Sequence, residues 1–430
     1  MNVKTLNYDL IIIGAGPAGL MAAIQAGTAQ GAPGTRIPGV SILVLEKKPR
    51  PGRKLLVAGT GRCNISHTGG INDYLTHYGE PDGGRRKLLK SVLYGFSPEK
   101  LTEFFSLRGL PIKELHEGKL FPESERSIDV LKLLLHTAEE AGACFHCGDP
   151  VQELSCEKPA VASSRPFHVR TASGALYRAR SVILASGGAS WPKTGSAGDG
   201  YRIAESLGHT LVTPRPALAP IELEAYPFAE LSGISVPVEL RIPGFLKKSA
   251  RLSGDLLFTH RGLSGPVVLN SSRYLAQGLP IEISFTAHTA EELRNLLSGQ
   301  KAGGGRLVKS GLHLLQLPDR FIRLLLRQSG VSEELKLAQL GKRDRQRIIR
   351  LLTSWPLRVS RVGGWDRAML TAGGIRLSEV DPGTLESRLV PGLFFAGEVL
   401  DIDGDEGGYN LQFAFSSGAV AGRTAAAKIL

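Results

Sequence analysis

The sequence predicts an α/β protein in which a domain of two or three layers is interrupted by a β-barrel-like insertion that carries a small helical insertion of its own. Three observations predict this class. A strand, a glycine-rich turn and a helix open the chain, and a second strand–loop–helix unit closes it. Between them, the hydrophobic periodicity changes from alternating to helical.

The opening segment, YDLIIIGAGPAGLMAAIQAG at residues 8–27, combines an apolar strand, a GxGxxG turn and an alanine-rich helix. Glycines at these positions permit a tight turn, a close approach of backbone to pyrophosphate and close helix–strand packing. The helix N-terminus then faces the phosphates. We therefore expect a Rossmann-like dinucleotide site formed by Gly14, Ala15, Gly16, Pro17, Ala18 and Gly19.

A second apolar strand, VSILVLEKK at residues 40–48, carries Glu46 near its end. An acid there can accept hydrogen bonds from a ribose 2′-OH, although it lies further along than the usual spacing of about 20 residues. A loop insertion at residues 27–39 accounts for the excess. We expect Glu46 and the adjacent Lys47 to contact the adenosine half of the cofactor.

The closing segment, residues 391–426, reads as a strand, an acidic glycine-rich loop and a helix of small residues that begins near Tyr409. Such a unit completes many flavoproteins, in which an acid at the position of Glu398 meets the flavin ribityl chain. The N–H groups of the helix would face the flavin and favour its anionic reduced form. This places a second group of contacts at Gly397, Glu398, Gly408, Tyr409, Asn410 and Leu411.

A third segment, ARSVILASGGAS at residues 179–190, is a strand that ends in Ser186, Gly187 and Gly188, followed by a glycine turn and a helix. In FAD enzymes of this architecture, such a strand leaves the nucleotide domain beside the flavin. FAD is therefore preferred to NAD as the resident cofactor.

Taken together, these stretches resemble the bacterial NAD(P)/FAD-dependent oxidoreductases called aminoacetone-oxidase or bile-acid-reductase-like flavoproteins. The most specific matches are GRKLLVAGTGRCNIS at 52–66, GDLLFTHRGLSGP at 254–266 and GLFFAGEVLDIDGDEGGYNLQFAFSSGAVAG at 392–422. The resemblance implies FAD binding, a three-part architecture and redox activity. It leaves the substrate open, because members of the family differ in their reactions.

The loop GTGRCNISHTG at residues 59–69 follows the second strand on the expected flavin side. By resemblance, its GRCN segment contacts the cofactor, and we expect a clamp that includes Arg53, Lys54, Gly59, Gly61, Arg62, Cys63 and Asn64. Cys63 has no second cysteine nearby in sequence, so a small buried thiol is favoured over a redox pair. His67 stands where the family is expected to carry asparagine.

The middle of the chain predicts the domain boundaries. Segments 234–242 and 279–287 alternate as strands do, whereas residues 289–351 carry apolar residues at helical spacing. We expect an FAD-binding domain at 1–192 and 363–430, a β-rich domain at 193–288 and 352–362, and a helical domain at 289–351. Substrate would then enter between the flavin and the β-rich insertion.

Two weak candidates for a catalytic residue are His260 and Tyr409. His260 is either an acid near the flavin or a structural histidine that ties the β-rich domain together. Tyr409 either touches the isoalloxazine or packs. Cys144 and Cys147 fall on a predicted strand, so their sulfurs face opposite sides and a metal or redox role is disfavoured. The backbone at nearby Val151 is expected to meet the adenine, and we expect no metal.

The charge and the amino-acid composition limit the kinds of partner that we expect. The formal net charge is +12, yet the aromatic content is 6% and the basic residues are scattered, which weighs against nucleic acid. Arg343, Arg347 and Arg350 fall at helical spacing and predict a solvated helix face. Four cysteines and no long apolar run predict a cytoplasmic protein without a membrane anchor. The oligomeric state stays open.

The function predicted is an FAD-dependent oxidoreductase that moves hydride between NAD(P)H or a small organic substrate and the flavin. No second GxGxxG unit for NAD(P)H is present, so NAD(P)H is expected only as a transient donor. Three alternatives stay open. They are an oxidase that uses dioxygen on a small amine or ketone, a flavin-dependent tRNA-modifying enzyme and a non-catalytic FAD-binding protein.

Overall fold

The computed structural model describes residues 5–28, 40–79, 83–157, 165–244, 252–298 and 305–430. The chain divides into two compact units, of which the first comprises Met1–Arg215 with Met369–Leu430 and the second comprises Pro216–Ala368. Most of the predicted 27–39 insertion lies outside the described residues.

The first unit is built on a seven-stranded sheet whose order is β6-β2-β1-β9-β8-β7, with β18 paired to β9. Strands β6, β2, β1, β9 and β18 run parallel, whereas β8 and β7 join antiparallel. The strands are β1 Thr5–Ile13, β2 Ile42–Glu46, β6 Ala143–Cys147, β7 Val151–Cys156, β8 Phe167–Thr171, β9 Leu176–Leu184 and β18 Leu393–Phe395.

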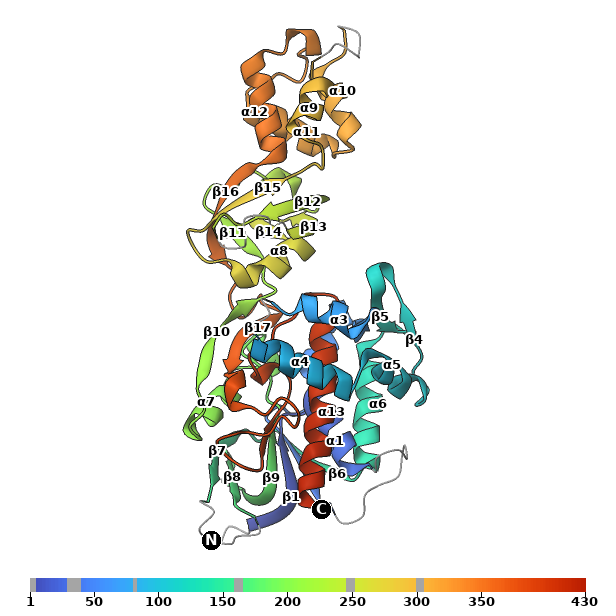
Figure 1. The fold of residues 1–430 in the computed structure, drawn as a ribbon, viewed down its shortest axis with the longest axis vertical. Coiled ribbons are helices and arrows are strands. Elements are labelled where there is room, and N and C mark those ends of the chain that lie inside the picture. The colour runs from blue at the N-terminus through green and yellow to red at the C-terminus, as the bar shows by residue number, and fades with distance from the viewer. Residues whose placement is uncertain (1–4, 29–39, 80–82, 158–164, 245–251, 299–304) are drawn as a thin grey trace. The chain divides into compact units, whose positions relative to one another are not determined.

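Helices and two smaller sheets complete this unit (Figure 1). The helices are α1 Pro17–Gly27, α2 Arg53–Val57, α3 Ile71–Tyr74, α4 Gly83–Gly95, α5 Pro98–Ser106, α6 Ser127–Glu140, α7 Asp199–Ser206 and α13 Tyr409–Ile429. One small sheet pairs β3 Ser66–His67 with β5 Lys119–Pro122 and β4 Ile112–Glu114, and the other pairs β10 Leu211–Ala217 with β17 Leu370–Ile375.

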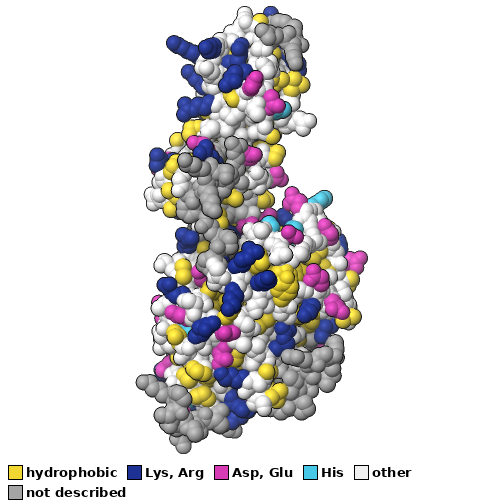
Figure 2. All heavy atoms as spheres, viewed as in Figure 1, with side chains coloured by type: hydrophobic (Ala, Val, Ile, Leu, Met, Phe, Trp, Pro, Cys, Tyr) yellow, Lys and Arg dark blue, Asp and Glu magenta, His cyan; other side chains and the backbone are white. Residues whose placement is uncertain are grey.

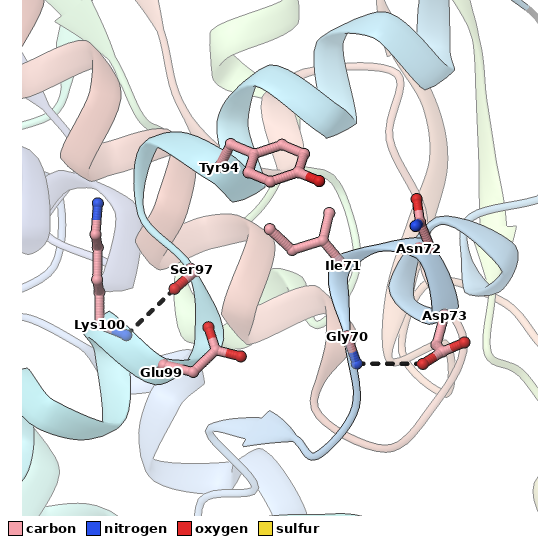
Figure 3. A pocket seen from close by; sticks show the side chains of 8 residues that line it. All are labelled: Gly70, Ile71, Asn72, Asp73, Tyr94, Ser97, Glu99 and Lys100. Atoms are coloured by element: carbon pink, nitrogen blue, oxygen red, sulfur yellow. Dashed lines mark hydrogen bonds between the residues drawn. The ribbon is translucent and has the colours of Figure 1, made fainter.

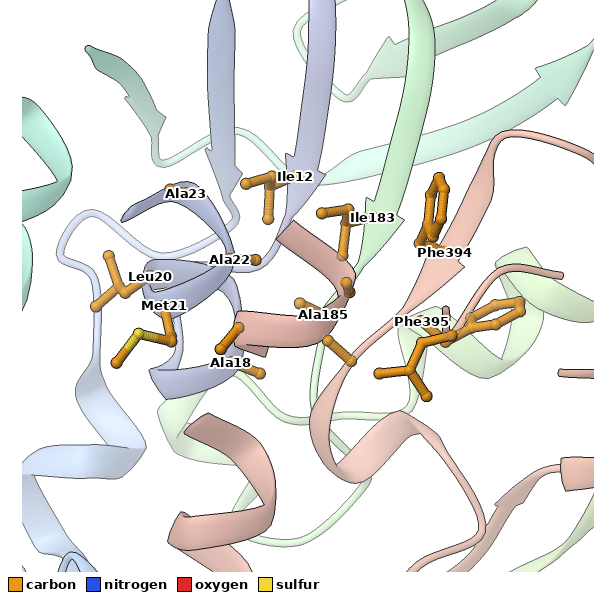
Figure 4. Packing of buried hydrophobic residues seen from close by; sticks show 14 of the residues in the cluster. Ile12, Ala18, Leu20, Met21, Ala22, Ala23, Ile183, Ala185, Phe394 and Phe395 are labelled. Carbon is orange, nitrogen blue, oxygen red and sulfur yellow. The ribbon is translucent and has the colours of Figure 1, made fainter. Parts of the chain in front are cut away.

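Helices α1 and α13 pack against each other at close range because small residues line their contact. A Cβ added at Gly418 would lie 2.2 Å from the Ala18 carbonyl oxygen, and one at Gly422 would lie 2.3 Å from the Ala22 oxygen. Ile12, Ile183 and Phe394 project from the sheet into the same buried cluster as the α1 side chains (Figure 4). This packing fixes the start of α1 beside the ends of the parallel strands.

The second unit contains a closed antiparallel barrel of order β11-β14-β13-β12-β15-β16. Its strands are β11 Ile221–Leu223, β12 Ser235–Arg241, β13 Leu252–Phe258, β14 Gly262–Ser264, β15 Pro280–Ser284 and β16 Trp355–Val362. Its helices are α8 Pro266–Ser271, α9 Ala290–Leu296, α10 Val308–Leu312, α11 Asp319–Ser329 and α12 Lys342–Thr353. The predicted α/β class with an inserted barrel is confirmed.

The three-part division of the chain stays a prediction. The first compact unit runs to Arg215, so it includes α7, which the sequence assigned to the β-rich part. The helices α9 to α12 share one buried hydrophobic cluster with the barrel. Across the ranges that the structure describes, no helix has the length and apolar character needed to cross a bilayer.

Candidate functional site

The glycine-rich turn between β1 and α1 has the geometry that its motif predicts. Gly14 has a φ of 107°, which favours glycine, and an added Cβ there would lie 2.5 Å from the Ala185 carbonyl oxygen. A Cβ on Gly19 would lie 1.9 Å from the Gly14 oxygen. By contrast, a Cβ on Gly16 would meet no described atom within 4 Å. The N-terminus of α1 therefore opens onto free space at Gly16.

Glu46 lies beside this turn, at the end of β2. One carboxylate oxygen accepts a hydrogen bond of 3.0 Å from the Ala15 N–H, and the other accepts one of 2.8 Å from the Lys48 N–H. The adjacent Lys47 forms an ion pair with Asp199 at the start of α7. The acid is thus placed at the mouth of the turn, where its ribose role stays a prediction.

A charged cluster joins three of the predicted segments. The Lys54 ammonium lies 2.7 Å from one Glu398 oxygen and donates a 2.6 Å hydrogen bond to the Ser190 hydroxyl. Ser190 in turn donates to the other Glu398 oxygen over 3.0 Å. Thr371 donates its N–H to that same oxygen over 2.9 Å, and its hydroxyl accepts from the Ala189 N–H over 2.8 Å. Chain segments more than 300 residues apart are tied together at one point.

Gly188 sits inside this cluster and has no room for a side chain. A Cβ there would lie 2.3 Å from the Thr371 hydroxyl and 2.7 Å from a Glu398 oxygen. Tyr201 of α7 approaches from another side, with its hydroxyl 3.4 Å from the Glu398 backbone oxygen. Burial and the Glu398 carboxylate raise the pKa of Tyr201, so its hydroxyl stays protonated.

The GTGRCNISHTG loop forms a compact turn next to the start of α13. Gly59, Gly61 and Cys63 all have positive φ, and Cys63 is fully buried as a free thiol. Burial raises the pKa of this thiol, which disfavours the reactive thiolate. The interpretation of Cys63 as a small buried thiol is confirmed. Arg62 is exposed and lies 3.4 Å from Glu125 and 5.1 Å from the centre of the Phe121 ring.

Two buried polar atoms in these loops have no hydrogen-bond partner among the described residues. They are the Asn64 side-chain oxygen and the Ser186 hydroxyl. An added Cβ on Gly408, whose φ is 102°, would lie 2.8 Å from that Asn64 oxygen and 2.3 Å from the Ser66 carbonyl. Buried polar atoms are almost always paired in native proteins, so both atoms point to a bound polar group. The open space at Gly16 and these two atoms fit an elongated dinucleotide such as FAD.

Tyr409 begins α13 and is 4% exposed, in the centre of an aromatic cluster. Its ring stacks on His77 with a centroid distance of 4.1 Å and on His67 with a distance of 5.0 Å. Tyr74 meets it edge-on at 5.1 Å. This surrounding favours the packing role for Tyr409, and burial raises the pKa of its hydroxyl. His67, at the expected asparagine position, supplies part of that packing.

The acidic loop before α13 is contacted by basic side chains of the same unit. Arg85 of α4 lies 3.1 Å from Asp401 and 3.2 Å from Asp403. His77 lies 3.0 Å from Asp405. Asn410 accepts from the Gly404 N–H over 2.7 Å and donates to the Gly404 and Asp405 oxygens over 3.0 Å each. The loop is therefore held by the first turn of α13, and Asn410 has a structural role there.

Several residues of this region were missed by sequence reasoning. Ser66 donates to the Gln412 side chain over 2.6 Å, and Gln412 donates to the Ser416 hydroxyl over 2.8 Å. All three side chains are fully buried. Gln412 lies one residue past the predicted contacts, within the GYNLQ segment, so the motif was a usable signal. Ser190 ends the quoted ARSVILASGGAS segment, and Thr371 lies in the LTAGGI sequence at residues 370–375.

Three further predicted residues are Arg53, Val151 and His260, and their roles stay predictions. Arg53 is exposed at the first position of α2, and Val151 begins β7, paired with Thr171. His260 is exposed in the turn between β13 and β14, within the second unit. That turn is held by Tyr226, whose hydroxyl lies 2.6 Å from the Thr259 oxygen and 2.8 Å from the Gly262 oxygen. Tyr226 therefore helps to hold this turn of the barrel, and the role of His260 stays a prediction.

The comparisons with known proteins agree with this site. Residues 8–424 match the family described as HI0933-like protein Rossmann domain. The chain belongs to the HI0933-like family. The resemblance to bile-acid-reductase-like FAD-binding oxidoreductases is confirmed, because this family model matches nearly the whole chain and a relative of 33% identity is named as a bile-acid reductase.

The relative named as a bile-acid reductase is a 3-dehydro-bile acid Δ4,6-reductase from Clostridium scindens. It is 33% identical over 96% of this chain and 98% of its own length. Two ribosomal RNA dihydrouridine synthases follow. The Escherichia coli protein is 32% identical over 95% of this chain and 96% of its own, and the Haemophilus influenzae protein is 30% identical over the same shares.

Solved structures share the fold at lower identity. Escherichia coli quinol fumarate reductase FrdA aligns with a TM-score of 0.52 at 16% identity, over 99% of this chain and 71% of its own. The 3-ketosteroid Δ1-dehydrogenase of Sterolibacterium denitrificans aligns with a TM-score of 0.51 at 13% identity, over 99% of this chain and 100% of its own. These likenesses concern the fold alone. The family and its relatives make this chain an FAD-dependent oxidoreductase.

Proposed function

We propose that the protein is an FAD-dependent reductase of a carbon–carbon double bond that is conjugated to a carbonyl group. One observation carries the proposal. Relatives of 30–33% identity over at least 95% of this chain have names that describe two substrates of this kind. A dehydro-bile acid and the uracil ring of uridine share no scaffold, but each reaction saturates a double bond next to a carbonyl carbon or its vinylogue.

The chemistry of this reaction balances with NAD(P)H as the proposed donor. NAD(P)H and a proton are consumed, the substrate gains hydride at the β-carbon and a proton at the α-carbon, and NAD(P)⁺ leaves. Bound FAD supplies the two-electron hydride chemistry that links the two halves. The proton must come from water or from a side chain at the substrate.

The residues of the first unit are suited to hold the cofactor. The turn at Gly14–Gly19 and the N-terminus of α1 would bind its pyrophosphate, and Glu46 would take the adenosine ribose. Lys54 and Glu398 would meet the flavin end, together with the unpaired Asn64 oxygen. The first N–H groups of α13 carry partial positive charge, which favours the anionic reduced flavin.

A second candidate substrate is a uracil base within RNA. Two of the named relatives are ribosomal RNA dihydrouridine synthases, and the net charge of +12 suits a polyanion. Dispersed basic residues and few aromatic residues weigh less against nucleic acid beside relatives of this identity.

The test is anaerobic. The purified protein is expected to be yellow, and NADH or NADPH should bleach the flavin absorbance. Adding an enone, such as a 3-keto-Δ4 steroid, or a uridine-containing ribosomal RNA should restore the colour and yield the saturated product. Glu398→Gln is expected to retain much less FAD because it removes the charge that holds Lys54, whereas the exposed Glu153→Gln should retain all of it.

The competing functions predict other results. Reoxidation by dioxygen with an amine or ketone oxidised, and no reaction with enones or uridine, would assign an oxidase. A flavin that NADH, NADPH and every organic substrate leave oxidised would assign a binding protein without catalysis. Either result would overturn the proposed reductase.

A further inference from the structure

A pocket with a volume of about 710 Å³ lies in the first unit, outside the cluster around Glu398. Its lining comes from the start of α3, the end of α4 and the start of α5, and it is formed by Gly70, Ile71, Asn72, Asp73, Tyr94, Ser97, Glu99 and Lys100. Pockets that bind small molecules commonly measure about 300–1,000 Å³, so the size suits a nucleotide.

Tyr94 is the aromatic residue of this pocket, and its side chain is 55% exposed. The Lys90 ammonium lies 5.9 Å from its ring centre, one helical turn earlier on α4. Figure 3 shows the Tyr94 ring and the Ile71 side chain drawn between Asn72 and Lys100. An exposed ring with a cation nearby offers a face on which a base can stack.

Exposed cations lie on α4 and α5, the two longer helices that contribute to the lining. Arg86, Lys87 and Lys90 on α4 are exposed, as is Lys100 on α5. Figure 2 shows Lys and Arg side chains over the part of the view in which Figure 1 draws α4. None of these four cations forms an ion pair with an acid of the described residues, in contrast to Arg85, which is held by Asp401 and Asp403. They are available for phosphate.

The remaining lining groups match the other parts of a nucleotide. The Asn72 amide is exposed, and an amide can read the donor and acceptor edge of a base. Glu99 is also exposed, and Asp73 accepts from the Gly70 N–H over 3.2 Å. Carboxylates of this kind hydrogen-bond ribose hydroxyls in nucleotide sites. The lining therefore offers an ammonium group for a phosphate and carboxylates for ribose hydroxyls.

We propose that this pocket is a nucleotide-binding site in which a base stacks on Tyr94 while Lys90 and Lys100 hold its phosphate. The ligand chemistry has two sources, a free dinucleotide such as NADPH and an unpaired nucleotide of an RNA strand. The site is separate from the FAD turn at Gly14–Gly19, and it does not depend on which bond the enzyme reduces.

Binding to the oxidised, FAD-loaded protein tests the site. One arm titrates NADP⁺ and NAD⁺, which cannot reduce the flavin, by calorimetry. The other titrates a labelled RNA stem-loop with an unpaired loop by anisotropy at two salt concentrations. Tyr94→Ala is expected to weaken binding at least fivefold in one arm or both, whereas Tyr94→Phe, which keeps the ring, should bind as the wild type does. Lys100→Ala should weaken binding and reduce its salt dependence.

The control is Lys132→Ala, an exposed lysine of α6 outside the pocket, which should leave every affinity unchanged. FAD content and the reduction of an enone by dithionite-reduced protein should also be unchanged in all variants. Binding to neither probe, or a loss of less than fivefold in Tyr94→Ala, would overturn the site. If the protein lacks reductase activity yet binds a nucleotide through Tyr94, the proposed function fails and the site stands.

Discussion

Glu398 illustrates what single residues decide in this molecule. Its carboxylate lies 2.7 Å from the Lys54 ammonium and accepts hydrogen bonds from Ser190 and Thr371. Four segments of the chain therefore depend on one acid. A bare motif such as Gly397-Glu398 indicates that an acid is needed, but not which cation or hydroxyl meets it.

His209 provides a prediction at the same scale. Its side chain is fully buried, 3.2 Å from Glu379 and 3.0 Å from the Ser387 hydroxyl. Burial lowers the pKa of His209, which Glu379 opposes in part. The folded protein therefore binds fewer protons here than the unfolded chain, whose histidine pKa is about 6.5. This contribution to stability is complete above that pH and is lost as pH falls below it toward the lowered folded pKa.

Urea unfolding of the wild type and His209→Gln between pH 7.5 and 5.5 checks this prediction. The wild type should lose free energy of unfolding more steeply over that range, because the variant has no proton to take up at this site. Equal slopes for the wild type and His209→Gln would contradict the assignment.

Among the elements, α1 and α13 matter most because their contact positions the glycine turn. Both helices are rich in Ala and Gly, and Gly418 and Gly422 have no space for a Cβ. The small residues are thus a packing requirement as well as a compositional feature. The alanine-rich pattern predicts helices, but it does not predict that these two helices cross each other.

We expect Gly422→Ala to destabilise the first unit, although alanine is a better helix former than glycine by about 1 kcal/mol. The new Cβ would lie 2.3 Å from a backbone oxygen, so the helices must separate, at a cost of about 1–3 kcal/mol. FAD retention should fall together with the stability of the first unit, because the glycine turn expected to bind the phosphates leads into α1. Thermal unfolding and flavin release measure both effects.

Gly83→Ala is the matched control, since an added Cβ at this first residue of α4 meets nothing within 4 Å. It should be neutral or stabilise by up to about 1 kcal/mol. A Gly422→Ala protein as stable as Gly83→Ala would show that the helix contact can relax.

At the scale of the whole molecule, the described residues contain two buried hydrophobic clusters, one in each compact unit. One contains the sheet, α1 and α13, and the other contains the barrel and α9 to α12. All the proposed FAD contacts fall in the first compact unit. Cofactor binding should therefore stabilise one unit more than the other.

Calorimetry is expected to resolve two unfolding transitions, and FAD should raise the midpoint temperature of one of them. At a free FAD concentration of 100 times its Kd, the free energy of unfolding of that unit should rise by about 2.7 kcal/mol. Riboflavin, which lacks the pyrophosphate and adenosine, should shift the transition less. Phe321 belongs to the second cluster. Phe321→Leu should therefore lower only the midpoint temperature of the transition that FAD does not shift. A single transition that moves as a whole would contradict the separation into two units.

The sequence by itself determined the class of the fold, the turn at Gly14–Gly19 and the cofactor family, because these depend on local chemistry. A strand, a glycine turn and a helix that follow one another along the chain specify a phosphate site, and no distant residue is needed. It also located the strand of Cys144 and Cys147 and the exposed helix face of Arg343, Arg347 and Arg350. Each of these features is encoded within a few adjacent residues.

Only the tertiary structure decided which distant residues meet. The contacts of Glu398 with Lys54, Ser190 and Thr371, the network of Ser66 with Gln412, and the stacking of Tyr409 on His67 and His77 all join segments far apart in the chain. Hydrophobic periodicity carries no information about such pairs, because burial is non-directional whereas hydrogen bonds and ring contacts are specific. Folding brings the loops together, and only then do their side chains form one site.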